Sequence, residues 1–353
     1  GRGGRPGLDP YGEAVLIAKD EIEAKDLEEF YINAPAEDVN SRCADESVLV
    51  THILSLIASG FARNRDDLVT FLDRTFYYFQ HKKSRVMEAV TKKALDFLEN
   101  AGMITNLGGN LSATEYGTLV SLLYIDPRGA ETIVSGMRSA KGYSDMGLLH
   151  LLCTTPDMFC LYVSNKDLPT MERYLLENED ELWLDLSFGE EEPFFRALKT
   201  ALVLRDWTGE VPIETICERY SIGAGDVHAL VESCNWLLHA SGRLSSMCAP
   251  RFTRAIREFE VCMKHGIRRE LLPLVRLRNI GRVRARSLYS NGITTPDALR
   301  AADPRVVASI LGRGVAQSVL KQLEQEDSDD RDGTGGDTGT PLVQSRLDAF
   351  SAR

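Results

Sequence analysis

Long apolar runs and paired cysteines are both absent from this sequence of 353 residues. No stretch of eighteen apolar residues occurs, and the first residues show no charged-then-apolar leader, so neither a membrane span nor a secretory signal is predicted. The seven cysteines are odd in number and include no C-x-x-C pair, which argues against a disulfide framework and a zinc site. We therefore expect a cytoplasmic protein with reduced, mostly buried thiols and no bound metal.

Basic residues are also outnumbered by acidic ones, 41 against 52, so the formal net charge is −11. This excess of acid argues against a polyanionic partner. One segment departs from it, because residues 264–286 hold eight basic residues against a single acid, Glu270. A local basic stripe of this kind is the footprint that phosphate binding requires, whatever the global sum.

Helical periodicity dominates the chain after residue 46. Three helices are expected over 47–60, 68–76 and 86–98, followed by two short extended pieces around a turn at 108–110, which is the order of a winged helix. Residues 118–265 carry only helical patterns broken by prolines and predict a bundle of six or seven helices. The predicted fold is therefore mainly α and multidomain.

The two ends of the chain are expected to differ from this middle. The apolar run Glu13–Ala18 predicts a buried parallel strand, and an acidic helix follows it. Residues 266–325 predict short helices joined by glycine-rich turns. From Glu324 to Thr340 the composition becomes too polar to bury a core, which predicts a disordered linker.

Two arginines stand three apart among glycines at the start of the sequence, Arg2 and Arg5 in the run Gly1–Gly7. Such spacing lets the backbone approach closely while both guanidiniums reach one anionic target, although a flexible basic tail would have the same composition. The run resembles the sixth helicase motif of superfamily 2 enzymes, Q-x-x-G-R-x-G-R-P-G, without its first residues. We interpret the opening as the interior of a longer protein.

The wider order of segments is similar to that of the archaeal Ski-like superfamily 2 DNA helicases, and the runs Leu119–Pro127 and Gly147–Leu152 look typical of this branch. The resemblance implies the end of a second RecA-like lobe over 1–40, a winged helix over 41–125 and a helical-bundle ratchet domain over 126–265. It further implies a helix-hairpin-helix domain over 266–325 and a disordered tail over 326–353.

That resemblance also implies a function. The whole enzyme would be an ATP-dependent 3′–5′ helicase acting in replication-fork repair or recombination, a monomer that binds single-stranded and forked DNA. Arg2 and Arg5 would face ATP, with Arg5 as the arginine finger, whereas most residues that hold ATP and Mg²⁺ would precede this chain. The chain alone should therefore not hydrolyse ATP.

One predicted helix carries a tryptophan on its outer side. Asp226 could cap a helix running to about Ser245, whose core stripe is Val227, Leu230, Val231, Cys234, Leu237 and Leu238. Trp236 falls on the opposite face, beside Ala229, Glu232, Ala240 and Arg243. It could pack on another helix of the bundle, or it could stack on a base of single-stranded DNA, as the resemblance implies. Family members carry an arginine where this chain has Ala229, so His228 or Arg243 would have to supply the cationic contact.

The basic stripe contains a second candidate site. The run Leu277–Tyr289 resembles a helix-hairpin-helix, with Asn279 and Gly281 where positive φ would be tolerated. A hairpin of this kind points backbone N–H groups at a phosphate, although a solvated charged face remains the alternative. The basic residues expected to add charge there are Arg276, Arg278, Arg282, Arg284 and Arg286, and Gly312–Ala316 could be a degenerate second hairpin.

A short motif ends the sequence. Gln344, Leu347 and Phe350 fit the pattern Q-x-x-L-x-x-F of a sliding-clamp binding peptide, with Ser351 where a second aromatic is usual. Two other functions stay open at this stage. The chain could be a stand-alone nucleic-acid-binding module tethered to the clamp, or it could belong to an RNA-remodelling relative with the same architecture.

Overall fold

Helices make up most of the computed structural model, which describes residues 4–5, 7–35, 38–41, 46–81, 85–186, 189 and 191–332. Within these ranges the strands form one two-stranded antiparallel sheet. The mainly α fold class is therefore confirmed. Among the described residues no helix is both long and apolar enough to cross a bilayer.

The N-terminal segment differs from its prediction. Residues 11–18 form no regular structure, and the apolar side chains of Val15 and Ile17 are exposed, so the predicted strand is wrong. A parallel strand needs neighbouring strands to pair with, and none of the described residues pairs with this run. The acidic helix is confirmed as α1 (Glu21–Leu27), which Asp20 caps and a π-helical turn extends to Ile32.

Four helices and a hairpin follow. They are α2 (Glu46–Ala58), α3 (Arg65–Leu72), α4 (Phe76–His81), α5 (Arg85–Asn100), β1 (Ile104–Leu107) and β2 (Asn110–Ala113). The hairpin turns through Gly108 and Gly109, both at positive φ, as a two-residue loop requires. The second predicted helix is split into α3 and α4, because the chain turns after Leu72 and Thr75 caps the new start through a hydrogen bond from Tyr78.

A bundle of long helices comes next. It follows α6 (Glu115–Leu123), which packs on α2, and its helices are α7 (Pro127–Ser139), α8 (Asp145–Cys153), α9 (Leu168–Asn178), α10 (Glu191–Thr208), α11 (Ile213–Tyr220), α12 (Ala224–Cys248) and α13 (Pro250–His265). Helix α8 packs on α10, and α13 turns back at Ala249 to run along α12. Small residues of α12 allow this close approach, as the hydrogen bond between Ser245 and Thr253 at 3.0 Å shows.

The last described part consists of short helices. After a 3₁₀ turn (Arg269–Leu271) they are α14 (Leu272–Val275), α15 (Arg282–Ser290), α16 (Pro296–Ala301), α17 (Pro304–Leu311) and α18 (Arg313–Asp332). The linker predicted from Glu324 is wrong up to Asp332, because α18 continues through it. The clamp motif at 344–350 lies outside the described residues.

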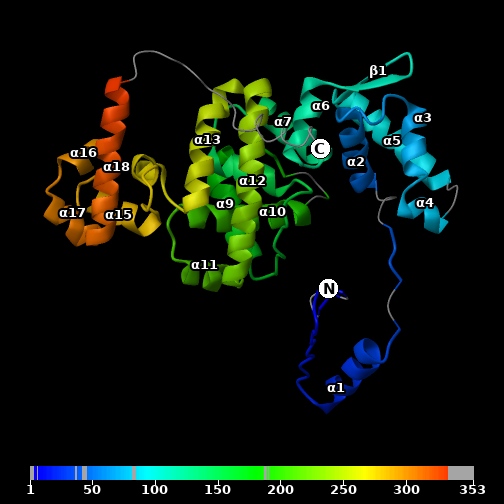
Figure 1. Cartoon of the computed structure of the whole chain (residues 1–353), viewed down its shortest axis with the longest axis horizontal. Helices are drawn as coiled ribbons and strands as arrows, with labels where there is room; N and C mark the ends of the chain where they lie inside the picture. The colour runs from blue at the N-terminus through cyan, green and yellow to red at the C-terminus, as the bar shows by residue number, and fades with distance from the viewer. Residues whose placement is uncertain are drawn as a thin grey trace.

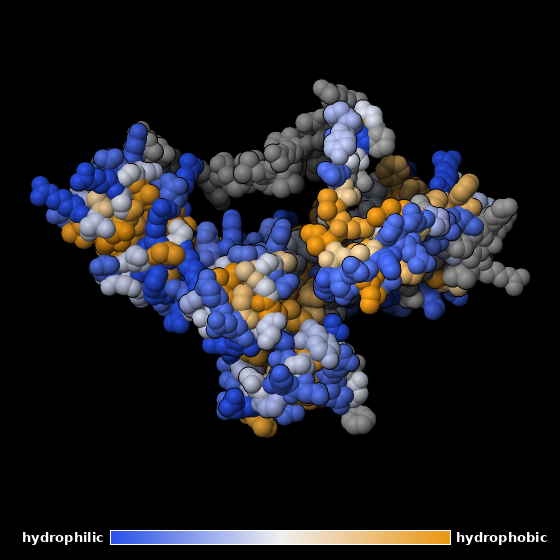
Figure 2. Space-filling model, turned by 90° about the horizontal axis from the view of Figure 1, so that it is seen from below, coloured by the Kyte–Doolittle hydropathy of each residue, from blue (hydrophilic) through white to orange (hydrophobic). Residues whose placement is uncertain are grey.

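Figure 1 shows these parts in a row: the group α2–α6 at one end, the bundle in the middle and α15–α18 at the other end. The N-terminal segment with α1 extends away from the rest of the molecule. Figure 2 shows hydrophobic side chains on the surface of the half that holds this segment and α2–α6. The exposed large hydrophobic residues of this half of the chain include Ile17, Phe30, Phe61 and Phe79.

Candidate nucleic-acid interface

Helix α12 is the element that positions the candidate stacking residue. It begins at Ala224, two residues before the predicted cap, and Asp226 lies in its first turn, where its carboxylate accepts the backbone N–H of Gly223 at 2.9 Å. The predicted core stripe is confirmed, because each of its members is buried (Val227, Leu230, Val231, Cys234, Leu237 and Leu238).

Trp236 lies on the opposite face of α12, at the edge of the bundle. The residue is 38% exposed, and its indole N–H donates to the backbone carbonyl of Leu123, at the end of α6, over 3.1 Å. The tryptophan is therefore held in place along one edge and still reaches solvent. Ala240 was expected beside it on this face, but it is fully buried.

Of the two residues expected to supply a cation near Trp236, Arg243 lies on the same exposed face, two turns farther along α12. Its guanidinium is exposed and makes no hydrogen bond or ion pair with any residue that the structure describes. His228 lies two turns before Trp236 and its ring contacts Trp207 edge to face, with 5.8 Å between the ring centroids. The indole of Trp207 donates in turn to the carbonyl of Met263 at 2.8 Å.

Arg282 and Arg286, which were expected to bind phosphate, are engaged within the protein. The Arg282 guanidinium lies 5.4 Å from the centre of the Trp207 ring and donates to the carbonyl of Val211 at 2.9 Å. Arg286 donates to both carboxylate oxygens of Glu210, at 2.6 and 2.7 Å, and to Glu270 at 2.8 Å. Although burial alone would raise the pKa of Glu210, the hydrogen bonds from Arg286 and from the backbone N–H of Arg268 lower it. These arginines therefore fasten α15 to the end of α10.

Sequence reasoning missed the residues that form this junction. Glu210 has a φ of +65°, an uncommon conformation for a residue other than glycine, and it receives hydrogen bonds from two arginines, Arg268 and Arg286. The chain has a Gly209-Glu210 pair directly after α10, which signals a turn but not its partners. No sequence pattern near residue 210 points to α15.

The hairpin before α15 keeps the other three candidate arginines at the surface. Asn279 has a φ of +68°, as expected of the residue that replaces a glycine, but Gly281 has a φ of −99° and serves as the N-cap. Its expected positive φ is thus wrong, since the turn has already been completed at Asn279. Arg284 donates to the Asn279 carbonyl at 2.8 Å, and the side chains of Arg276, Arg278 and Arg284 are exposed.

The N-terminal arginine motif is described only in part. Arg5 is an exposed residue whose side chain lies 3.5 Å from the carboxylate of Asp9, and its backbone N–H donates to that carboxylate at 2.8 Å. Arg2 lies outside the described residues. Among the residues that are described, no cluster of histidine, cysteine and acidic side chains could hold a metal ion.

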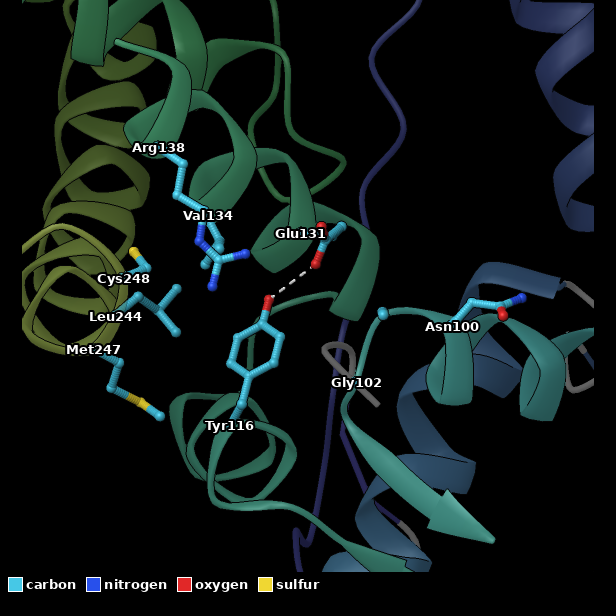
Figure 3. A pocket seen from close by; sticks show the side chains of 10 residues that line it. Asn100, Gly102, Tyr116, Glu131, Val134, Arg138, Leu244, Met247 and Cys248 are labelled. Atoms are coloured by element: carbon cyan, nitrogen blue, oxygen red, sulfur yellow. Dashed lines mark hydrogen bonds between the residues drawn. The ribbon is translucent and has the colours of Figure 1, made fainter. Parts of the chain in front are cut away.

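A cavity of about 390 Å³ lies where α6 and the end of α5 face the bundle. Figure 3 shows Tyr116 pointing into it toward Glu131, and its hydroxyl donates to that carboxylate at 3.4 Å. Burial raises the pKa of Tyr116, and the negative charge of Glu131 raises it further, so the hydroxyl stays protonated. Arg138 also lines the cavity, with Met247 from the end of α12.

Three family models match the chain. Residues 12–105 match a helix-turn-helix domain, 146–266 match domain 4 of archaeal helicases, and 271–325 match a SAM-like helix-hairpin-helix tandem. The tandem supports the second hairpin expected at Gly312–Ala316, where Gly312 joins α17 to α18 at a φ of +81°.

Curated relatives agree with these matches. The chain is 41% identical over 334 residues to the ATP-dependent DNA helicase Hel308 of Methanocella arvoryzae, covering 92% of this chain and 45% of the relative. It is 33% identical over 332 residues to that of Pyrococcus horikoshii, covering 92% and 46%. The chain thus spans a little under half the length of these relatives. It belongs to the archaeal Ski-like family of superfamily 2 helicases, as a C-terminal part of such a protein.

Proposed function

We propose that this chain is the DNA-gripping part of an ATP-dependent 3′–5′ DNA helicase that acts in replication-fork repair or recombination. The relatives named as ATP-dependent DNA helicases support this proposal. Their greater length supports a helicase over a stand-alone binding module, and their names favour DNA over RNA. The protein would be a cytoplasmic monomer that binds single-stranded and forked DNA.

The outer face of α12 carries the proposal. An indole fixed along one edge by Leu123, with Arg243 two turns farther along the same face, offers a flat ring and a cation to a passing strand. Arg276, Arg278 and Arg284 would contact phosphates at the hairpin before α15, with the backbone at Gly281. Because Arg282, Arg286 and His228 already contact protein groups, we assign them to the support of this surface instead.

ATP and Mg²⁺ would be held mostly by residues that this chain does not contain. Arg2 and Arg5 would reach the phosphates, with Arg5 as the arginine finger, and its exposed side chain suits contact with a neighbouring lobe. The chain alone would therefore not hydrolyse ATP. Gln344, Leu347 and Phe350 would bind the sliding clamp.

The test is the affinity of the chain for a fluorescent single-stranded oligonucleotide, followed by anisotropy. Trp236→Ala should weaken binding by about 5- to 150-fold, because a stacked base contributes roughly 1–3 kcal/mol. Loss of the indole hydrogen bond should cost only about 1 kcal/mol of stability. Phe159→Ala, at another exposed aromatic, is the control and should leave binding unchanged. Unchanged affinity in the Trp236 variant would refute the assignment.

A further inference from the structure

A groove runs between α12 and α13, and its lining includes Arg243 from the face of α12 that carries Trp236. The cavity there has a volume of about 480 Å³. It is lined by His239, Gly242, Arg243, Arg257, Glu260, Val261 and Lys264. Gly242 is buried where the helices meet, and a β-carbon on it would lie 3.6 Å from Cγ of Arg257. The aliphatic part of Arg257 therefore packs across α12, while the residue itself stays exposed at the groove.

Three basic side chains line this groove without partners. Arg243, Arg257 and Lys264 are exposed, and within the described part of the chain no residue accepts a hydrogen bond from their charged groups or pairs with them. Their situation differs from that of Arg286, which two carboxylates neutralise. Three unpaired cations in one groove of an acidic protein produce a local positive field that an anion would neutralise.

The single acid of the groove is already engaged. Glu260 of α13 accepts from Nδ1 of His239 across the groove at 3.2 Å. This contact ties the two helices together and leaves the cations in excess.

The groove is continuous with the face that carries Trp236. At about 100° per residue, Arg243 lies almost directly below Trp236, roughly 10 Å along the axis of α12. Arg257 and Lys264 are also seven residues apart, so they form a second row of about the same length on α13. One cation below the exposed indole on α12 and a row of two cations on α13 match a strand whose bases stack on one side and whose phosphates face the other.

We propose that the groove formed by Arg243, Arg257 and Lys264 binds the phosphate backbone of the single DNA strand whose base stacks on Trp236. This assigns α13 a direct part in gripping DNA, in addition to supporting α12. The inference rests on the proposed function of the outer face of α12.

The test is the salt dependence of oligothymidine binding by the whole chain, measured by anisotropy. A cation that contacts a phosphate of a single strand contributes about 0.7 to the slope of log affinity against log salt, which corresponds to about fivefold in affinity near 0.1 M salt. Arg257→Gln and Lys264→Gln should each lose about this amount, and the double variant about 25-fold. Glu260→Gln should bind more tightly than the unaltered chain.

Arg254→Gln is the matched control. Arg254 lies on the same helix and carries the same charge, but it pairs with Glu258 at 2.9 Å outside the groove. If Arg257→Gln and Lys264→Gln change the slope no more than this control while Trp236→Ala still weakens binding, the groove proposal is wrong and the stacking site stands. If the chain does not bind the oligonucleotide, or if Trp236→Ala has no effect, both proposals fail.

Discussion

Arg286→Ala should destabilise the junction between α15 and the end of α10. The Arg286 side chain makes three charge-assisted hydrogen bonds of 2.6–2.8 Å, two of them to Glu210. The side chain of Glu210 is 12% exposed, so its carboxylate would keep only the backbone N–H of Arg268 as a donor after the substitution. A fully buried carboxylate that loses its ion-pair partner lowers the stability of the folded state by about 3–5 kcal/mol.

The expected magnitude is smaller because the pair is partly solvated. The Arg286 side chain is one-third exposed and Glu270 is more exposed still, so the bond to Glu270 adds little. We expect a loss of about 2 kcal/mol, mainly from the contact with Glu210. For a cooperative unit of the size of the helix-hairpin-helix tandem, this corresponds to a decrease of roughly 8–16 °C in melting temperature.

Differential scanning calorimetry of the chain measures this shift. Arg284→Ala is the control, since this neighbouring arginine donates only to the Asn279 carbonyl of its own hairpin. A cycle with Glu210→Gln isolates the interaction, because the double variant should lose less than the sum of the two single losses. Equal melting temperatures for Arg286→Ala and Arg284→Ala would show that the junction does not depend on this ion pair.

Two further predictions concern the packing of α6 and of the helical bundle. Gly117→Ala should destabilise the protein by several kcal/mol, because a β-carbon there would lie 1.9 Å from the carbonyl oxygen of Met103. Gly225→Ala is the control, since a β-carbon at Gly225 meets no atom within 4 Å and should not lower the melting temperature. Burial lowers the pKa of His150 to about 4, so as the pH falls below about 6.5 this side chain takes up a proton in the unfolded chain before it does so in the folded one. The free energy of unfolding should therefore decrease by up to about 1.4 kcal/mol per pH unit down to pH 4. Denaturation of His150→Gln should show a weaker pH dependence over that range, and an unchanged dependence would contradict the assignment.

Local patterns predicted those parts of the fold that local forces determine. The core stripe of α12 and the Gly108–Gly109 turn follow from helical periodicity and from backbone conformations that glycine favours. Asn279 was likewise identified by its tolerance of positive φ. These features depend on residues that are close together in the sequence.

Features that depend on distant partners could not be predicted in this way. Arg286 and Glu210 are 76 residues apart, so the sequence predicted a single phosphate-binding surface, although Arg282 and Arg286 are engaged in the junction. The run Glu13–Ala18 has the composition of a buried strand, but composition does not supply a neighbouring strand. The α13 side of the groove was missed because Arg257 and Lys264 stand in an ordinary amphipathic helix pattern.

The central claim is that single-stranded DNA contacts the outer face of α12. Photocrosslinking to an oligonucleotide that contains 5-iodouracil, followed by peptide mapping, tests it directly, because the iodinated base reacts with an aromatic ring stacked on it. We predict that the crosslinked peptide contains Trp236 and that excess unlabelled oligonucleotide suppresses it. Crosslinks confined to other parts of the chain, with Trp236 unmodified, would contradict the account.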